Sequence, residues 1–378
     1  MKFACTQENL IQGLTMVSHV TGKNVNLPIL GNVLLKTDHG NLRMSATNLE
    51  IAVNCLVRGK ADEEGEYSVP AKLLLDYVSL LPSGKVDLTL TDEGLEIGSN
   101  GQETVMKGMP ASEFPLLPKL AKGEGYSLSA TDLKRALSQV TFAASTSESR
   151  PELMGVACYF GSVDGKAVAT FAATDSYRLA ERRIPLGAGS VRESRSIVPA
   201  RSMLEISRIV SSYRDEMAGG EDVIWTFTDN QLVVTLGNVE VVTRLIEGSF
   251  PPYQDIIPKA FRTEAVLQRT ELLKAVRAAS LFSRQGLFDV HLTFDPDAGT
   301  CAIASADQGT GKTKTAVKGT VTGVANKVTL NFRYVNDGLS AMQTDTVRIQ
   351  LIDDGNPVLI LPEPASEAYR YLVMPIRQ

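Results

Sequence analysis

The stretch Ala172-Ala173-Thr174-Asp175 passes from small apolar residues to two polar ones, which is the pattern of a strand that runs into a turn. The chain carries two similar stretches, Ser45-Ala46-Thr47-Asn48 and Ala304-Ser305-Ala306-Asp307. The final residues of the three stretches are separated by 127 and 132 residues. This period is the length of one ordinary domain, so we expect each stretch to mark one domain of a triplicated chain.

An apolar stripe with helical spacing precedes each of these stretches. Its residues follow the spacing i, i+3, i+4, i+7, which is typical of an amphipathic helix, and a small residue recurs where another backbone comes close. The three stripes are Leu10, Gly13, Leu14 and Val17; Leu133, Ala136, Leu137 and Val140; and Leu272, Ala275, Val276 and Ala279. A residue of the capping type stands before each stripe, namely Thr6, Thr131 and Thr270.

Two further features recur after each stretch. A short strand enters a second helix at Val69-Pro70-Ala71, Val198-Pro199-Ala200 and Leu330-Asn331-Phe332, and proline suits the first turn of a helix. An alternating hairpin then turns at Asp92-Glu93-Gly94, at Asp229-Asn230 and at Asp353-Asp354-Gly355. Four features in the same order indicate three homologous domains, which we place at residues 1–122, 123–258 and 259–378, joined near Lys119–Glu124 and near Pro258–Thr263.

The predicted fold class is α+β. Each domain is expected to be a doubled unit of helix plus antiparallel sheet, because clean alternation such as Val86-Asp87-Leu88-Thr89-Leu90 is typical of a sheet with one face covered. Six helices are then expected, in the windows 7–20, 71–81, 131–143, 200–214, 270–284 and 331–342.

Composition predicts an ordinary water-soluble protein of the cytoplasm. Hydrophobic residues make up 43% of the chain and charged residues 21%. No apolar run is long enough to span a membrane, and the N-terminus does not resemble a secretory signal. The four cysteines are scattered, which indicates reduced thiols.

The distribution of charge matters more than the net charge of −5, which alone argues against binding nucleic acid. The six helical windows hold ten basic and six acidic residues, a net charge of +4, so the rest of the chain carries −9. One interpretation is that these helices merely carry solubilising charges. The other is that they face a polyanion, since diffuse contacts of lysine and arginine with phosphates give affinity without reading a base sequence.

Features of catalysis and of cofactor or metal binding are lacking in the sequence. His19, His39 and His291 lie far apart, and no zinc, serine-hydrolase or dinucleotide motif occurs, so we expect neither a cofactor nor a metal. The segment 306–313 resembles a phosphate-binding loop, but the residues after it, 314–322, have the composition of a strand rather than of the helix that such a loop requires. We therefore interpret it as a hairpin turn.

Four motifs together resemble the bacterial β sliding clamps, the β subunit of DNA polymerase III. They are Leu27-Pro28-Ile29-Leu30-Gly31-Asn32, Ala173-Thr174-Asp175-Ser176-Tyr177-Arg178-Leu179-Ala180, Phe250-Pro251-Pro252-Tyr253 and Tyr371-Leu372-Val373-Met374-Pro375-Ile376-Arg377. The resemblance covers the whole chain. It departs from some members at Tyr177, where they have histidine, and at Gln378, where an apolar residue is common.

The resemblance implies a non-catalytic processivity factor that encircles double-stranded DNA as a head-to-tail homodimer. It also implies a pocket for short linear peptides of the DNA polymerase III α subunit, the clamp-loader δ subunit, other polymerases and repair proteins. The implied pocket consists of Leu153, Thr174, Tyr177, Arg178, Leu179, Pro251, Ile256, Leu372, Met374, Pro375, Ile376 and Arg377. Without the resemblance, the apolar members of this set would be assigned to the core.

Two further groups of residues complete the expected sites. The residues expected to face DNA are Lys23, Lys72, Lys134, Arg135, Arg150, Arg201, Arg208, Lys274, Arg277 and Arg333. Those expected at the dimer interface are Thr104 and Met106 in the first domain and Leu281 and Phe282 in the third.

Two other classes of protein remain open on the sequence alone. An enzyme built from triplicated domains would need a convergent polar site, which no segment supplies. A non-catalytic scaffold of triplicated domains that does not encircle DNA is the other alternative, and the basic helices argue against it.

Overall fold

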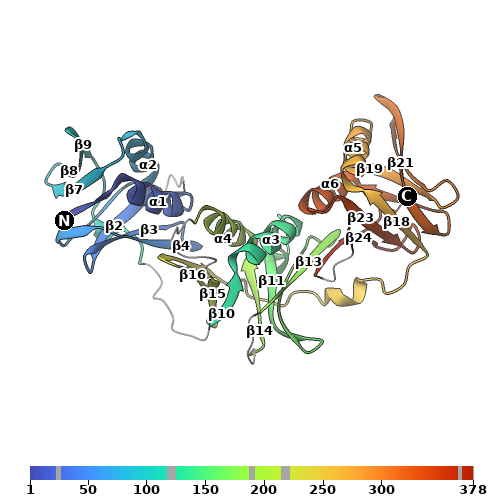
Figure 1. The fold of residues 1–378 in the computed structure, drawn as a ribbon, viewed down its shortest axis with the longest axis horizontal. Coiled ribbons are helices and arrows are strands. Elements are labelled where there is room, and N and C mark those ends of the chain that lie inside the picture. The colour runs from blue at the N-terminus through green and yellow to red at the C-terminus, as the bar shows by residue number, and fades with distance from the viewer. Residues whose placement is uncertain (23–26, 117–124, 187–191, 214–221, 365–367, 378) are drawn as a thin grey trace. The chain divides into compact units, whose positions relative to one another are not determined.

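A computed structural model describes residues 1–22, 27–116, 125–186, 192–213, 222–364 and 368–377. The chain divides into two compact units. Unit 1 comprises Met1–Lys134 and Arg201–Leu245, and unit 2 comprises Arg135–Ala200 and Ile246–Gln378. Each unit is described by itself below (Figure 1).

The six helical windows all contain a helix, so that prediction is confirmed. The helices are α1 (Gln7–Ser18), α2 (Ala71–Leu80), α3 (Ala130–Val140), α4 (Ala200–Ser212), α5 (Arg269–Ser280) and α6 (Phe332–Ala341). Every residue of the three predicted stripes is buried. Gly13 shows why a small residue recurs there, because a Cβ at that position would lie 2.4 Å from a methyl group of Val57.

The predicted caps are correct at one helix out of three. The Thr6 hydroxyl accepts a hydrogen bond from the Asn9 N–H at 3.3 Å and caps α1. At α3 the equivalent bond goes to Ser129, whose hydroxyl accepts from the Asp132 N–H at 3.4 Å. At α5 the N-cap is Gln268, without a side-chain cap, so Thr131 and Thr270 lie inside their helices. Both helices begin before the threonine that the sequence suggested.

Two antiparallel sheets form the β-structure of unit 1. The smaller has the order β5 (Lys60–Glu63), β1 (Lys2–Thr6), β7 (Lys85–Thr91), β8 (Gly94–Ser99) and β9 (Gln102–Met106). The larger has the order β10 (Gly125–Ser129), β15 (Asp222–Phe227), β16 (Gln231–Leu236), β17 (Val239–Arg244), β4 (Ile51–Val57), β3 (Asn41–Thr47), β2 (Asn32–Asp38) and β6 (Glu66–Pro70).

Unit 2 contains one antiparallel sheet of twelve described strands. The first six in order are β14 (Ser194–Pro199), β11 (Gly155–Val163), β12 (Lys166–Thr174), β13 (Arg178–Pro185), β25 (Tyr369–Val373) and β24 (Val358–Glu363). The order continues with β23 (Thr346–Leu351), β18 (Thr263–Gln268), β21 (Gly311–Gly323), β20 (Thr300–Asp307), β19 (Asp289–Asp295) and β22 (Asn326–Asn331).

Two strand pairs join segments from different sequence repeats. In unit 1, β17 pairs with β4, with Val241 opposite Val53. In unit 2, β13 pairs with β25, with Leu179 opposite Leu372. The sheets therefore continue from one repeat into the next, which explains why the two compact units divide the middle repeat.

The segment that resembles a phosphate-binding loop is a hairpin, as predicted. It joins β20 to β21, with Ala306 opposite Lys312 and Asp307 opposite Gly311. The Asp307 carboxylate accepts from the N–H groups of Gly309 and Thr310 at 2.8 and 3.2 Å. A strand follows the turn, so no helix N-terminus is present to bind a phosphate there.

We predict that Thr6→Ala lowers the free energy of unfolding by about 1 kcal/mol, because one N–H of the first turn of α1 loses its acceptor. Thr270→Ala is the matched control and should change it by less than about 0.5 kcal/mol, since the α5 cap uses no side chain. Urea denaturation followed by circular dichroism measures both. An equal loss in the two variants would show that the Thr6 cap is not the cause.

Candidate functional site

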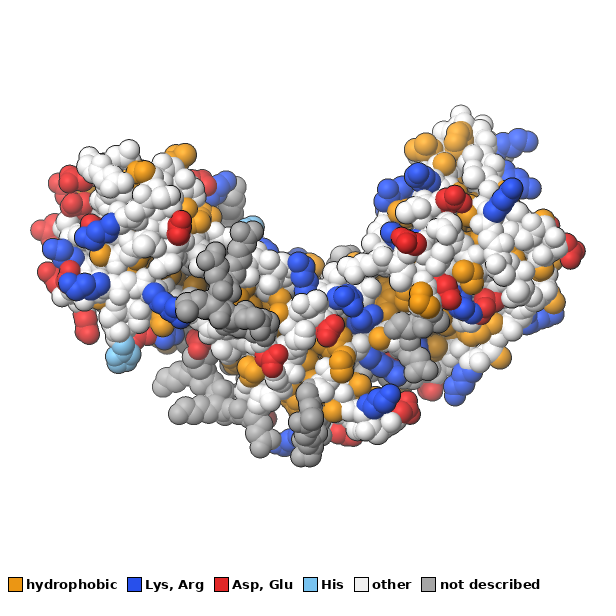
Figure 2. Space-filling model, viewed as in Figure 1, with side chains coloured by type: hydrophobic (Ala, Val, Ile, Leu, Met, Phe, Trp, Pro, Cys, Tyr) orange, Lys and Arg blue, Asp and Glu red, His pale blue; other side chains and the backbone are white. Residues whose placement is uncertain are grey.

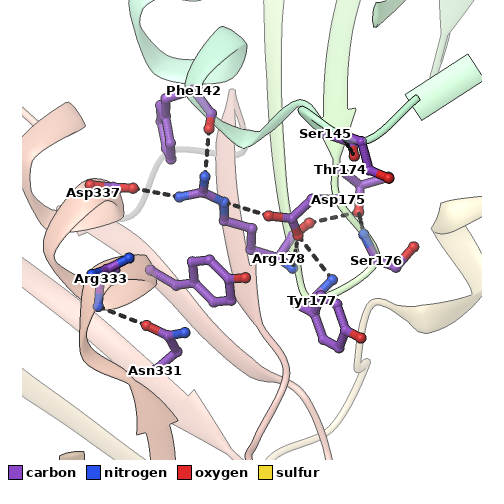
Figure 3. Close-up of polar contacts among 12 residues, drawn as sticks. Phe142, Ser145, Thr174, Asp175, Ser176, Tyr177, Arg178, Asn331, Arg333 and Asp337 are labelled. Atoms are coloured by element: carbon purple, nitrogen blue, oxygen red, sulfur yellow. Dashed lines mark hydrogen bonds and ion pairs between the residues drawn. The ribbon is translucent and has the colours of Figure 1, made fainter. Parts of the chain in front are cut away.

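The turn between β12 and β13 is held by the side chains of Thr174 and Asp175 (Figure 3). The Thr174 hydroxyl donates to the Arg178 carbonyl oxygen at 2.6 Å and accepts from the Ser176 N–H at 3.1 Å. One Asp175 carboxylate oxygen accepts from the N–H groups of Tyr177 and Arg178, both at 3.0 Å. These bonds hold Ser176 at a φ of 77° and leave Tyr177 63% exposed at the tip.

The same construction occurs after β3. The Asn48 side-chain oxygen accepts from the N–H groups of Glu50 and Ile51, both at 3.0 Å, and Thr47 bonds the Leu49 N–H and the Ile51 carbonyl oxygen. Together with the Asp307 turn, this gives three turns of one design, which confirms that the repeated sequence stretches run from strand into turn.

Arg178 distinguishes the middle turn from the other two. Its guanidinium donates to the Asp175 carboxylate at 3.0 Å, to the Asp337 carboxylate at 2.6 Å and to the Phe142 carbonyl oxygen at 2.7 Å. The same group stacks over the rings of Phe142 and Tyr334, with 5.4 and 4.6 Å between its central carbon and the ring centroids. One arginine thus connects three segments that lie far apart in the sequence (Figure 3).

These contacts change the role expected of Arg178. The side chain is only 11% exposed, and its partners within unit 2 already engage Nε, Nη1 and Nη2. Burial disfavours the cation, but the Tyr371 phenol, the bond to Asp337 and the charge of Asp175 together raise the pKa of Arg178. Arg178 therefore fastens the turn to α6, and its guanidinium is not a free cation of the expected pocket.

Strand β25 brings the C-terminal segment beside this turn. It pairs with β13 from Arg178 opposite Val373 onwards, and the Met374 N–H donates to the Tyr177 carbonyl oxygen at 2.8 Å. Two residues later, the Ile376 N–H donates to the Thr329 carbonyl oxygen at 2.8 Å. The segment is thus docked by main-chain hydrogen bonds, and Met374, Pro375 and Ile376 are half-buried next to exposed Tyr177.

The apolar members of the expected pocket fall into two layers. Leu179 and Leu372 are each 1% exposed and belong to a core cluster with Ala172, Leu359 and Tyr253. Leu153 and Thr174 are buried too. Leu179 and Leu372 are therefore buried beneath the expected pocket and form its floor. Solvent reaches Tyr177, Ile256 and Arg377, and in part Pro251, Met374, Pro375 and Ile376.

A buried carboxylate fixes the segment that carries Pro251 and Ile256. The Tyr253 hydroxyl donates to Glu181 at 2.7 Å, and the Arg183 guanidinium lies 3.1 Å from the other carboxylate oxygen. Burial and the charge of Glu181 raise the pKa of the Tyr253 phenol, which therefore remains the hydrogen-bond donor. Tyr253 begins the short 3-10 helix Tyr253–Ile256, so this bond positions Ile256 at the surface.

Sequence reasoning missed the residues that hold the site together. Glu181, Asp337 and Phe142 contact Tyr253 or Arg178 but belong to none of the recurring motifs. Tyr253 itself stands in the quoted Phe250-Pro251-Pro252-Tyr253 motif, where a hydroxyl among apolar residues signals a buried hydrogen bond.

The basic residues expected to face DNA are mostly exposed on helices. In unit 1 these are Lys72, Lys134 and Arg201; in unit 2 they are Lys274, Arg277 and Arg333. Figure 2 shows basic side chains gathered over α5 and α6. Between these two helices Arg277, Arg333 and Asp337 contribute to an open hollow of about 320 Å³. Arg135 is half-buried, and Lys23 lies outside the described residues.

Two members of this set form ion pairs within their own unit. The Arg208 guanidinium donates to the carbonyl oxygens of Thr15 and Met16, at 3.0 and 2.8 Å, and to Glu205. It therefore ties α4 to the end of α1, which corrects its expected role as an open phosphate contact. Arg150 forms an ion pair with Glu152 at 3.0 Å and remains exposed.

The residues expected at the dimer interface lie at two strand or helix ends. Thr104 and Met106 belong to β9, the outermost strand of its sheet. Met106 is 5% exposed and packs into its own unit, whereas its neighbour Val105 is exposed. Leu281 and Phe282 directly follow α5, and Leu281 is 73% exposed.

The described residues contain no cluster of three or more His, Cys, Asp or Glu side chains that could hold a metal ion. All four cysteines are buried, and burial raises the pKa of Cys5, Cys55 and Cys301 to about 12. These thiols are therefore protonated and unsuited to nucleophilic attack. None of the helices in the described part of the chain is long and apolar enough to cross a membrane.

We predict that Tyr253→Phe lowers the free energy of unfolding by about 1–3 kcal/mol, because it removes the hydrogen bond to the buried Glu181 carboxylate and leaves that group with the Arg183 contact alone. Tyr159→Phe is the matched control: its hydroxyl contacts Glu193 at the surface, at 3.3 Å, so the expected loss is below about 0.5 kcal/mol. Denaturant titration of both proteins gives the comparison. Similar losses of unfolding free energy in the two variants would show that the buried hydrogen bond to Glu181 stabilises the protein no more than the surface contact does.

Comparison with known proteins gives one consistent result along the chain. Three family models match it: the N-terminal domain of the DNA polymerase III beta subunit over residues 1–118, the central domain over 127–252 and the C-terminal domain over 254–377. The beta sliding clamp of Synechococcus elongatus is 32% identical over all of this chain and 99% of its own length. The beta sliding clamp of Staphylococcus aureus is 26% identical, again over all of this chain and 99% of its own length.

Solved structures agree with this result. The DNA polymerase sliding clamp of Bacillus subtilis superposes with a TM-score of 0.90 at 26% identity, covering 100% of this chain and 99% of the other. The DNA polymerase III beta subunit of Pseudomonas aeruginosa has the same fold, with a TM-score of 0.91 at 24% identity and full coverage of both chains. From its three domain matches and its full-length relatives, the chain belongs to the DNA polymerase III beta subunit family, the beta sliding clamps.

Proposed function

We propose that this protein is a DNA sliding clamp, a processivity factor that encircles duplex DNA and tethers the replicative polymerase to it. The observation that carries the proposal is the match to all three clamp domains, in order and over nearly the whole chain. The ring would form from two chains joined head to tail, first domain to third, and would give two identical contacts.

The exposed basic residues of the helices support the DNA-binding part of the proposal. Lysine and arginine side chains that contact phosphates give affinity that is independent of base sequence. In unit 2, Lys274 and Arg277 on α5 and Arg333 on α6 are exposed within one pair of packed helices. Lys72 and Arg201 are exposed on two helices of unit 1. A clamp that moves along DNA needs attraction of this diffuse kind.

The surface around Tyr177 is the proposed site for partner peptides. Exposed Tyr177 and Ile256 and half-buried Met374 surround a floor of Leu179 and Leu372, which provides apolar contact area with main-chain groups nearby. Arg377 is the exposed cation of this surface and remains the candidate for pairing with acidic or carbonyl oxygens. The expected ligands are short peptides of the DNA polymerase III α subunit, the clamp-loader δ subunit, other polymerases and repair proteins.

The protein is proposed to act in the cytoplasm without catalysis and without a cofactor. The buried, protonated cysteines and the hairpin at 306–313 support this part of the proposal, because the former are poor nucleophiles and the latter lacks the helix of a phosphate-binding loop.

Encirclement predicts that DNA topology decides retention. Protein loaded onto a nicked circle should stay bound through gel filtration in high salt, because a closed ring has no free end to leave by. Cutting the circle should release most of it. Blocking both ends of the linear DNA with bound streptavidin is the control and should restore retention. Equal retention on open linear and circular DNA would contradict the proposal.

Removing Met374–Gln378 should abolish peptide binding while the dimer persists. The deletion takes away one side of the proposed site and the Met374 and Ile376 main-chain bonds, but leaves β25 paired with β13. Met374→Ala alone should weaken binding of a labelled polymerase peptide by about 1–3 kcal/mol, the range for burying one such side chain.

Fluorescence anisotropy measures the peptide affinity, and light scattering on the same samples measures the mass. Met109→Ala is the matched control, since Met109 is half-buried in unit 1 and should leave the affinity unchanged. An unaltered peptide affinity in the truncated protein would show that the peptide-binding site lies elsewhere on the molecule.

A further inference from the structure

Helix α6 borders two functional surfaces of the proposed clamp at once. Its exposed side carries Arg333 and, with Asp337, lines the open hollow of about 320 Å³ between α5 and α6. Its other side packs on β25, where Gly338 leaves no room for a Cβ beside the Tyr371 ring. The Tyr371 hydroxyl also donates to the Tyr334 carbonyl oxygen at 2.8 Å. A single helix therefore connects proposed DNA-facing residues with the strand that carries the proposed peptide site.

Asp337 is the carboxylate that these two surfaces share. One of its oxygens lies 2.6 Å from Nη1 of Arg178, yet 40% of the Asp337 side chain is exposed and lines the hollow. It is the only acidic residue of α6 and the only acidic one among the described residues that line the hollow. Figure 3 shows Asp337 reaching Arg178, with Arg333 on the same helix.

Two arginines of the hollow attract the Asp337 carboxylate away from the turn. Arg277 and Arg333 line the hollow, and neither forms an ion pair with another residue in the described part of the chain. Arg277 donates to the neutral Asn336 side chain at 2.9 Å, and Arg333 stacks over the Phe288 ring at 3.7 Å. Both positive charges are therefore uncompensated by an acid. Arg333 also stands four residues before Asp337, a spacing at which helical side chains of opposite charge attract each other.

An anion in the hollow shifts this competition in favour of Arg178. A phosphate bound by Arg277 and Arg333 neutralises the two competing charges and repels the Asp337 carboxylate. Both effects strengthen the pair between Asp337 and Arg178. Solvent screens charges at this open site, so the change has the size that is typical of exposed ion pairs. DNA phosphates are the anions that the proposed function brings to these helices.

The pair with Asp337 matters for Tyr177 because the turn that carries it is short. The Asp175 carboxylate accepts hydrogen bonds from the N–H groups of Tyr177 and Arg178 and from the Arg178 guanidinium. Fixing that guanidinium on α6 therefore fixes the turn from which Tyr177 projects, 63% exposed. A ligand that meets an ordered turn binds more tightly, because less conformational freedom is lost on binding.

We propose that Asp337 is a positioning residue that couples DNA to the partner peptide. Phosphates at Arg277 and Arg333 strengthen the pair between Arg178 and Asp337, and thereby raise the affinity of the Tyr177 surface for polymerase peptides. This inference rests on the proposed function and adds a regulation to it. By linkage, a bound peptide raises the DNA affinity by the same factor. The clamp then holds its partner more firmly on DNA than in free solution.

The first test compares the affinity of the full-length protein for a labelled polymerase peptide with and without a short blunt DNA duplex. Fluorescence anisotropy gives both values, and a separate titration with labelled duplex sets a saturating concentration. The peptide should bind roughly two- to fivefold more tightly with the duplex, which is the range for exposed ion pairs. A mixture of peptide and duplex without protein is the control for direct association. A duplex that leaves the peptide affinity unchanged, or lowers it, would overturn the coupling.

Two kinds of variant separate coupling from a merely structural role of α6. Asp337→Asn should weaken peptide binding roughly two- to fivefold and abolish the response to the duplex. Asp337→Glu keeps a carboxylate at this position and should retain the response. Arg277→Gln/Arg333→Gln removes both competing charges, so without DNA it should bind the peptide about as tightly as the wild type does with DNA. A structural role alone predicts no gain of affinity on the loss of two arginines.

Lys166→Gln/Lys327→Gln is the matched control for the loss of two cations. Both lysines are exposed in unit 2, and neither lines the hollow or forms an ion pair with a described residue. This variant should leave the peptide affinity and its response to the duplex unchanged. An equal change of affinity in the lysine and arginine variants would assign the effect to net charge and would overturn the role of the hollow.

Failure of the coupling is distinguishable from failure of the proposed function. An unchanged peptide affinity of Arg277→Gln/Arg333→Gln in the absence of DNA would overturn the coupling alone. A response to the duplex that survives Asp337→Asn would do the same. A wild-type protein that binds no polymerase peptide and is not retained on circular DNA would overturn the proposed function itself.

Discussion

Main-chain pairing between strands of different repeats is the interaction on which the rest of the molecule depends. The bonds from β13 to β25 and from β17 to β4 turn separate hairpins into continuous sheets. In unit 2, the site around Tyr177 exists only because β25 lies beside β13. The repeats are therefore not structurally independent, since the edge strand of one repeat completes the sheet of its neighbour. This pairing also covers a strand edge that could otherwise pair with other chains.

Two buried charges add specificity to this pairing. Arg178 is satisfied by Asp175, Asp337 and the Phe142 carbonyl oxygen, whereas Glu181 accepts a hydrogen bond from Tyr253 and forms an ion pair with Arg183. Burying a charge is costly unless its partners are in place, so each group tolerates one arrangement of the segments around it. The partners include residues of α6, of the 3-10 helix Thr141–Ala143 that follows α3 and of the 3-10 helix at Tyr253, so the two clusters fix the elements that surround the exposed surface.

Local features were predictable from the sequence, and distant ones were not. Periodicity located six helices and the turns of the hairpins, because helix stripes and turn residues act over a few positions. The caps at Thr131 and Thr270 failed because both helices begin two residues earlier than a cap at these threonines would require. The partners of Arg178 lie up to 159 residues away, and no pattern in one sequence links them. Solvent exposure could not be predicted from the sequence either. Leu179 and Met374 are both apolar residues of the quoted motifs, yet Leu179 is buried in the core and Met374 is only half-buried.

The pairing of β13 with β25 also bears on how the chain is made. A ribosome produces β13 long before β25, since Leu179 and its register partner Leu372 are separated by most of the third domain. During that interval β13 of the nascent middle domain lacks its partner strand. In the same way, β4 remains unpaired on one side until β17 has been synthesised. Folding of these sheets is thus coupled to the progress of translation. A ribosome that stalls in the third domain leaves a chain with an unpaired, aggregation-prone strand edge. Such a chain is a natural substrate for chaperones or for degradation.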